Sequence, residues 1–182
     1  MREILEQIKA DARYRKNVEW GRPRDGHPEG SVCDHIEVLE RNLAALRPKV
    51  SDEAYWKLLV LVHVHDSFKA EARQGVPITH PESHASLARA FLAEFCDDAD
   101  LLNMVQYHDE PFALWRQYDA KGRYNAERLH ALLNTIKDWD LFLAFLIVDG
   151  CTDGKDRVVL QWFLREIASK VNSRVGVDWI LP

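Results

Sequence analysis

Histidine and aspartate residues recur along this chain at positions that a helical repeat assigns to an apolar face. His35, for example, lies three residues after Val32 and four before Leu39, so the three side chains share one face of a predicted helix. Four further predicted helices carry such a residue at the same spacing from apolar neighbours. The inward-facing residues of the five helices are His35, His65, His84, His108 and Asp149, and Asp66 adjoins His65.

These six side chains are of the types that bind metal ions. A lone inward histidine is usually a hydrogen-bonded core residue, but five helices with the same feature require a shared explanation, because an unpartnered buried polar group costs free energy. A cation supplies that partner, and imidazole and carboxylate groups bind divalent Fe, Mn, Zn, Co or Mg. Six donors exceed the need of one tetrahedral ion, and the carboxylate of Asp66 can bridge two ions. The pattern predicts a site for two divalent metal ions.

The elements that must position these residues are helices. The apolar periodicity is helical almost throughout, with no alternating strand pattern, and Ser31 and Asp34 have the spacing of a capping box. The sequence therefore predicts an all-α fold: one helical bundle over residues 1–182, with a five-helix metal-binding core plus terminal helices. Irregular stretches are predicted at 20–30, 67–80 and 110–124. The predicted helices cover about 3–13, 31–46, 51–66, 81–91, 101–105, 125–149 and 157–171.

Length, charge and cysteine content narrow the class of protein. A chain of 182 residues suits one domain, and 47% hydrophobic with 29% charged residues excludes a disordered or collagen-like chain. The net charge of −5 argues against a dedicated nucleic-acid-binding protein. Three separated cysteines fit free thiols, and we find no signal peptide and no apolar run of about 20 residues. We therefore expect a cytoplasmic protein with no membrane segment.

The ordered set of His35, His65-Asp66 and Asp149 resembles the H…HD…D signature of the HD superfamily of metal-dependent phosphohydrolases. His84 and His108 resemble the additional ligands of its six-ligand, two-metal variant. The resemblance covers the core motif region 27–149, whose segments are similar to the phosphohydrolase domain of some bacterial tRNA nucleotidyltransferases. The chain lacks the glutamate pair that follows HD in alarmone hydrolases and the Gly-Tyr-Pro signature of cyclic-di-GMP phosphodiesterases, which makes those substrates less expected.

The resemblance implies a role for each residue. Lys69 matches the lysine that often follows HD and would bind a phosphate oxygen, unless it is a solvated lysine beyond a helix end. Asp109 would orient a ligand imidazole, act as a general acid, or simply be a surface charge at a helix terminus. The ligand assignment implied by the family is one ion on His35, His65 and Asp149, a second ion on His84 and His108, and Asp66 as the bridge.

Residues outside the metal set give indications of the substrate. Trp115, Tyr118 and Tyr124 alternate with cations such as Arg116, a pattern that suits stacked bases and bound phosphates; alternatively, the aromatic residues attach their loop to the protein body. The apolar end 177–182 is expected to dock on the chain's own core, with a homodimer contact as the alternative. No metal role is expected for His27, His63, His80 and His130.

The expected function is hydrolysis of a small phosphorylated molecule by a metal-activated bridging water. A nucleotide is expected as the substrate, cleaved as a phosphomonoester or a cyclic phosphodiester, with Asp66 and Lys69 as catalytic residues and Lys69 and Arg116 as substrate contacts. The first alternative is a mixed-valent di-iron oxygenase acting on a small polar substrate, because inositol oxygenase and a bacterial phosphonate oxygenase resemble the same ligand set. The second alternative is a binding module in which the metals only brace the helices.

Overall fold

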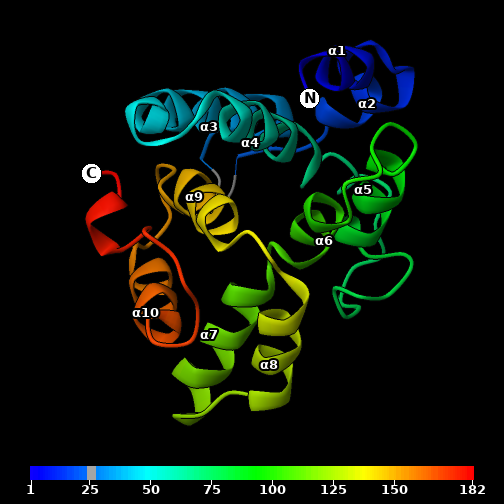
Figure 1. The fold of residues 1–182 in the computed structure, drawn as a ribbon. Helices are drawn as coiled ribbons and strands as arrows, with labels where there is room; N and C mark the ends of the chain where they lie inside the picture. Colours follow the sequence, from blue (N-terminus) through cyan, green and yellow to red (C-terminus); the bar gives the residue numbers. More distant parts are fainter. Residues whose placement is uncertain (24–27) are drawn as a thin grey trace.

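The computed structural model describes residues 1–23 and 28–182, and His27 of the sequence motif lies outside them. The described residues form helices joined by turns and loops, with no strand among them (Figure 1). The predicted all-α fold is confirmed. The α-helices are α1 (Arg2–Ala10), α2 (Ala12–Val18), α3 (Val32–Leu46), α4 (Asp52–Val64), α5 (His84–Leu92), α6 (Ala99–Tyr107), α7 (Glu110–Lys121), α8 (Ala126–Thr135), α9 (Trp139–Gly150) and α10 (Val158–Ile167), and the short 3-10 helices are η1 (Arg47–Lys49) and η2 (Val177–Trp179).

Side-chain caps fix where the helices that carry candidate ligands begin. The Ser31 hydroxyl accepts a hydrogen bond from the backbone N–H of Asp34 (3.1 Å), and the Asp34 carboxylate accepts one from the backbone N–H of Ser31 (3.1 Å). This is the predicted capping box at the start of α3. A cap orients a helix because it satisfies backbone donors that have no partner inside the helix. The N-caps of α4, α5, α6 and α9 are Ser51, Ser83, Asp98 and Asp138.

Helix α9 lies at the centre of the fold, where it packs against α3, α4 and α10 (Figure 1). All its side chains from Leu141 to Val148 are buried. A helix that is apolar on every face is stable only when neighbours cover it completely, which explains its central position. Asp149 follows this apolar run directly, so the burial of α9 brings a carboxylate to the middle of the molecule.

The helix predicted over 125–149 is wrong in its extent, because the structure divides it into α8 and α9. At the break, the Asp100 carboxylate accepts hydrogen bonds from the backbone N–H groups of Lys137 (2.9 Å) and Asp138 (2.8 Å). The Asp138 side chain then accepts one from the N–H of Leu141 (2.9 Å) and starts α9. These side chains satisfy donors that a continuous helix would use internally, so the chain can turn here.

The prediction of an irregular stretch at 110–124 is also wrong, because α7 occupies most of it. Pro111 lies in the first turn of α7, where its missing N–H removes no helical hydrogen bond. Gly122 ends the helix with a φ of 65°, a conformation that glycine adopts without steric cost. Pro111 and Gly122 therefore mark the two ends of a helix.

The aromatic residues of α7 attach this helix to α10. The rings of Trp115 and Tyr118 lie 5.5 and 5.3 Å from the ring of Trp162 on α10, and that of Tyr124 lies 5.6 Å from it. Aromatic pairs at these distances are stabilising contacts. The aromatic side chains that suggested base stacking therefore pack on Trp162 of the protein body, with Tyr118 40% exposed, which is the structural alternative that the sequence left open.

Smaller differences concern the bounds of the remaining elements. The N-terminal helix predicted over 3–13 is divided at Asp11, whose side chain caps α2, and the helix predicted from 81 begins at His84. Val175 and Trp179 are buried, so the C-terminal end docks on the chain's own core as expected. The three cysteines are free thiols. Among the described residues, none of the helices has the length and apolarity that a membrane span requires.

Replacing the cap residue of α4 tests how far this helix depends on it. Ser51→Ala removes the acceptor for the backbone N–H of Ala54, and we expect a loss of about 1 kcal/mol in the free energy of unfolding. In a chain of this length, the midpoint of thermal unfolding should fall by about 2–4 °C, as measured by circular dichroism. Ser51→Asp keeps an acceptor and should unfold close to the wild-type temperature; equal loss in both variants would contradict the capping role.

Candidate metal centre

The fold brings all six predicted ligands together in two groups. One group is His35, His65 and Asp149, and the other is Asp66, His84 and His108; within each group one ligand atom per residue lies within 4.8 Å of the others. The residues come from separate elements: α3, the end of α4, the first turn of α5, the end of α6 and the last turn of α9. Their convergence from distant parts of the sequence is the arrangement that the helical spacing predicted.

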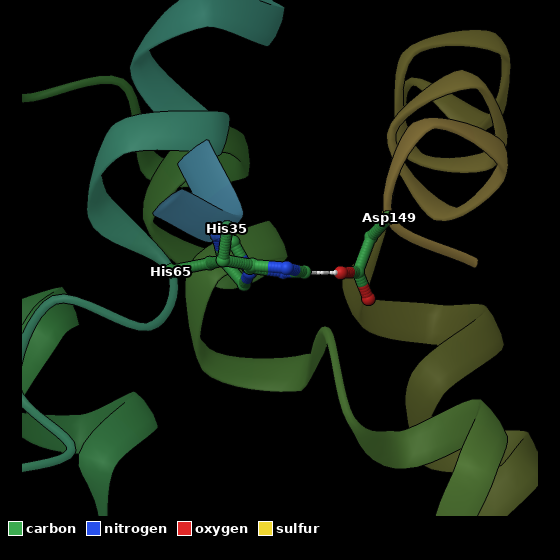
Figure 2. A group of neighbouring side chains, drawn as sticks. All are labelled: His35, His65 and Asp149. Atoms are coloured by element: carbon green, nitrogen blue, oxygen red, sulfur yellow. Dashed lines mark hydrogen bonds and ion pairs between the residues drawn. The ribbon is translucent and has the colours of Figure 1, made fainter. Parts of the chain in front are cut away.

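The first group converges on a single point between three helices. Figure 2 shows His35 and His65, which overlap in this view, both directed at the carboxylate of Asp149; the centroids of the two rings lie 5.8 Å apart. His35 Nε2 lies 3.0 Å and His65 Nε2 3.8 Å from Asp149 Oδ1. Two nitrogens and one oxygen that converge in this way form half of an octahedral shell, or most of a tetrahedral one.

The second group is joined to the first by Asp66. His84 Nε2 lies 3.2 Å from His108 Nε2, and these two nitrogens lie 3.6 and 3.5 Å from Asp66 Oδ1. The other oxygen of this carboxylate, Oδ2, lies 3.5 Å from His65 Nε2 in the first group. Each oxygen of Asp66 thus faces a different group, which is the arrangement required of a bridging ligand.

Hydrogen bonds on the opposite side of the rings fix which nitrogen is free to bind a metal. His65 Nδ1 lies 3.1 Å from the carbonyl oxygens of Leu61 and Val62, and His108 Nδ1 lies 2.7 Å from that of Val105. A carbonyl can only accept, so both Nδ1 atoms carry a proton, and the Nε2 atoms are the ones that face the other ligands and can bind a metal when they are deprotonated. Hydrogen bonds of this kind orient metal-binding histidines in proteins.

A carboxylate accepts the corresponding hydrogen bond from His35. Its Nδ1 donates a hydrogen bond to Glu29 Oε1 at 2.5 Å, and the side chains of both residues are buried. A carboxylate partner of this kind fixes the tautomer and orientation of the ring, so that His35 Nε2 faces Asp149. Glu29 lies in the segment that precedes the first predicted ligand, but no feature of the sequence distinguishes it from its neighbours.

Two atoms at the junction of the groups are buried and find no hydrogen-bond partner among the described residues: His65 Nε2 and Asp66 Oδ1. A buried polar atom without a partner costs about 1–3 kcal/mol, and more when it is charged. Both atoms face the points where the groups converge. A pair of divalent cations would satisfy them, so the residues present fit the predicted two-metal site.

The protonation states also suit metal binding. Burial lowers the pKa of His65 to about 3, so its imidazole is neutral near pH 7. Burial acts to raise the pKa of Asp66 and Asp149, but the charges of Lys69 and Lys155 outweigh it and hold both well below their usual range. Both carboxylates are therefore ionised, as ligands to divalent cations must be.

The pKa of His108 reflects the negative charge of the carboxylates around it. Burial alone would lower its pKa, yet the nearby carboxylates of Asp109 and Asp66 raise it to about 9. A proton on His108 therefore balances part of the negative charge, and a bound cation would take over that role. The field that favours this proton is the field that would attract a metal ion.

Two lysines contact the carboxylates of the centre. Lys69, which the sequence predicted, forms an ion pair with Asp66 Oδ2. Lys155, which it did not, donates to Asp149 Oδ1 at 2.7 Å. Lys155 lies in the loop between α9 and α10, and a glycine before it is the only local signal. Both ammonium groups are mostly buried and lie beside the candidate ligands.

Asp109 lies at the metal-facing side of the second group. Its carboxylate is half exposed, with Oδ2 3.2 Å from His84 Nε2 and Oδ1 3.8 Å from His108 Nε2. It contacts the Nε2 atoms that face the other ligands and not the Nδ1 atoms behind them, and it lines the cavity beside the centre.

A cavity of about 500 Å³ opens beside the centre. Its charged end is formed by centre residues such as Asp66, Lys69 and Lys155, and its other side by apolar side chains of α7, α9 and α10. Arg116, a predicted substrate contact, is not among the lining residues; it is exposed, and its guanidinium lies over the ring of Phe112 at 5.8 Å. Arg116 is therefore outside the cavity.

Histidines that were given no metal role have other partners where the structure describes them. His63 is buried on α4, where Nε2 donates to Glu40 (2.9 Å) and Nδ1 accepts from the hydroxyl of Tyr14 (2.5 Å). His80 accepts a hydrogen bond from the backbone N–H of Glu82, and His130 is exposed on α8. None of these three joins either group.

Arg157, which sequence reasoning missed as a functional residue, fixes the loop that carries Lys155. Its guanidinium donates to the carbonyl oxygens of Gly150 (3.1 Å), Cys151 (3.0 Å), Thr152 (2.8 Å) and Lys155 (2.9 Å). These carbonyls lie at and after the end of α9, where backbone acceptors have no helical partner. Arg157 therefore positions the loop beside Asp149.

Comparison with known proteins gave no relative: no family model matches the chain, and searches of curated proteins and of solved structures found no match. The functional argument therefore depends on the residues and their geometry.

Metal binding should stabilise the protein in a way that depends on His65. At a free metal concentration of about 100 times the dissociation constant, a ligand of the native state adds about 2.7 kcal/mol, which corresponds to about 5–10 °C in thermal unfolding midpoint. We expect this rise with Mn²⁺, Zn²⁺ or Fe²⁺ for the wild type and for His130→Ala, and none or a much smaller one for His65→Ala. An equal rise in His65→Ala would exclude the assigned ligand.

Removing the hydrogen bonds that Arg157 donates to the four carbonyl oxygens should destabilise the loop after α9. Arg157→Gln loses several charge-assisted hydrogen bonds, and we expect a cost of about 2 kcal/mol and a midpoint lower by about 4–8 °C. Arg165→Gln, at an exposed position of α10, serves as the matched control and should change the midpoint little. A wild-type midpoint for Arg157→Gln, measured by calorimetry, would show that the four carbonyls do not depend on this residue.

Proposed function

We propose that the protein is a metal-dependent phosphohydrolase of the HD superfamily. The observation that carries the proposal is the carboxylate of Asp66, with one oxygen directed at each of two groups of neutral or ionised metal-binding side chains. The order of these residues along the chain, H…HD…H…H…D, is the order in the six-ligand variant of that superfamily. Both the geometry and the order support the same assignment.

The chain would hold two divalent cations with the residues of the two groups. Bound there, such a pair lowers the pKa of a shared water and polarises the oxygens of a phosphoryl group. The ligands that would hold the first ion are His35, His65 and Asp149, those for the second are His84 and His108, and Asp66 would contact both.

The chain's own residues supply the remaining functions. Lys69 and Lys155 place ammonium groups beside the carboxylates of the centre, where they can bind phosphoryl oxygens as point charges. Asp109, at the border of the cavity, can accept a hydrogen bond from a water directed at the phosphorus and take up its proton at Oδ1 or Oδ2. The apolar side of the cavity limits the access of bulk water.

The substrate that we propose is a small phosphoester. The expectation of a nucleotide depended on Trp115, Tyr118 and Arg116, and these residues pack on Trp162 or lie outside the cavity. The proposal of a phosphoester depends on the two metal-binding groups and the two lysines; of these residues, Asp66, His108, Asp149, Lys69 and Lys155 line the cavity. The reaction class is thus better supported than any particular leaving group.

An oxygenase with two iron ions is the alternative that the same ligands allow, because imidazole and carboxylate groups bind iron as well as other divalent metals. The specific observation in its favour is the apolar side of the cavity, which would shield a reactive intermediate from water. Oxygen consumption by iron-loaded protein separates this function from hydrolysis.

The test of the proposed function is phosphate release from small phosphoesters by protein loaded in turn with Mn²⁺, Co²⁺, Zn²⁺, Mg²⁺ or Fe²⁺. Asp66→Ala should lower the rate by at least about a thousandfold, because a two-metal site supplies several kcal/mol of transition-state stabilisation. Its helical signal in circular dichroism should persist. Asp119→Ala, an exposed aspartate on α7, is the matched control and should retain the wild-type rate.

Two outcomes would overturn the proposal. Full activity in Asp66→Ala would assign the hydrolysis to another site or to a contaminant. Absence of phosphate release with every metal, together with substrate-dependent oxygen uptake by the iron-loaded protein, would establish the oxygenase instead.

A further inference from the structure

The cavity beside the metal centre has two chemically different sides. Its charged side consists of centre residues and of two further charged side chains, Lys155 and Asp156. Its apolar side is built by three helices and includes one rim residue, Phe112, that is 49% exposed. The apolar lining residues are Pro111, Phe112, Leu146, Val159, Leu160 and Phe163.

The types of side chain that are missing from this lining limit what can bind. Among the described residues that form the cavity, none is an asparagine, glutamine, serine or threonine. Nucleobases are commonly recognised by amide and hydroxyl groups that match their donors and acceptors, and burying a nucleobase against apolar walls without such partners is costly. The apolar side of the cavity therefore disfavours a nucleobase.

Lys155 provides an anion-binding group at the boundary between the two sides. Its ammonium donates to Asp149 Oδ1 (2.7 Å) and to the Asp149 carbonyl (3.2 Å), and Arg157 fixes its backbone. Its side chain is 23% exposed, so the ammonium is held near the centre and not in bulk solvent. A cation bound to Asp149 would compete with Lys155 for that carboxylate. The ammonium group of Lys155 could then donate a hydrogen bond to another anion.

We propose that this cavity binds a small phosphate ester or phosphonate with a short alkyl or aryl group, whose anion contacts Lys155 and whose apolar group packs on Phe112, Val159 and Leu160. This substrate class rests on the proposed function for its chemistry, but its binding can be measured without turnover. The volume of about 500 Å³ suits a molecule of this size.

The probes are methyl-, propyl- and pentylphosphonate, whose carbon–phosphorus bond resists hydrolysis, and inorganic phosphate. Binding to zinc-loaded protein is measured by titration calorimetry, since Zn²⁺ has no redox chemistry. We expect the affinity to rise by about fourfold per buried methylene until the apolar side is filled. Equal affinity for phosphate, methylphosphonate and pentylphosphonate would overturn the proposal.

Variants separate the two contacts. Lys155→Met should weaken all the phosphonates by about tenfold or more, while Lys155→Arg retains the positive charge and most of the affinity. The matched control, Lys121→Met at the exposed end of α7, should bind like the wild type. Unchanged affinities in Lys155→Met would exclude this lysine as the anion contact.

The apolar contact is tested by Phe112→Ala and Val159→Thr. Both should leave the affinity for methylphosphonate unchanged and reduce the gain from methyl to pentyl, because only the longer chains reach the apolar side. If both variants keep the wild-type gain in affinity from methyl- to pentylphosphonate, the alkyl group does not contact these two residues.

The experiment distinguishes this inference from the proposed function. Chain-length-dependent binding without hydrolysis of the corresponding alkyl phosphates under any metal would retain the binding site and overturn the phosphohydrolase. Hydrolysis that depends on Asp66, with no effect of alkyl chain length or of Lys155, would retain the phosphohydrolase and overturn the proposed binding site.

Discussion

A carboxylate buried between two sets of imidazoles is the constraint on which the rest of this structure depends. Removing the ionised side chain of Asp66 from water costs several kcal/mol unless partners replace the lost hydration. Lys69 pairs with one oxygen, while the other has no hydrogen-bond partner among the described residues. The helices therefore hold a charge that is only partly compensated, which is typical of a site built for a cation and not for stability alone.

The scaffold meets this constraint by placing polar side chains at the ends of apolar helices. The run Leu58–Val64 on α4 is buried, and His65 and Asp66 follow it directly. Asp149 follows the buried run of α9 in the same way, and His108 comes just after α6. Burial of the apolar runs supplies the free energy of folding, and the helix ends place the ligands in the buried region where the helices meet.

The helical spacing allowed the ligands to be predicted because five of them lie on apolar faces, and the sixth, Asp66, adjoins His65. His35 and His108 stand out from the sequence for this reason, and the structure brings them into the two groups. Asp100 and Trp162 explain the two elements that were predicted wrongly. Asp100 accepts hydrogen bonds from backbone groups 37 and 38 residues away, at the break between α8 and α9. Trp162 is the packing partner of α7. Such long-range contacts leave no periodic signal.

The loop residues were hardest to predict for the same reason. Lys155 and Arg157 act through backbone carbonyls and through Asp149, none of which imposes a pattern of residue types on the sequence. Glu29 is similar, because its partner His35 explains it only once the two are seen in contact. A ligand set can be read from spacing, whereas the residues around it require coordinates.

The attachment of α7 to α10 through Trp162 has a consequence for how this protein can diversify. The two helices form much of the apolar side of the cavity but contribute none of the six ligands. Their separation is set by aromatic rings that do not contact the centre. Mutations at this contact can therefore change the shape of the cavity while the six candidate ligands keep their positions, so that its apolar side can diversify by ordinary point substitutions.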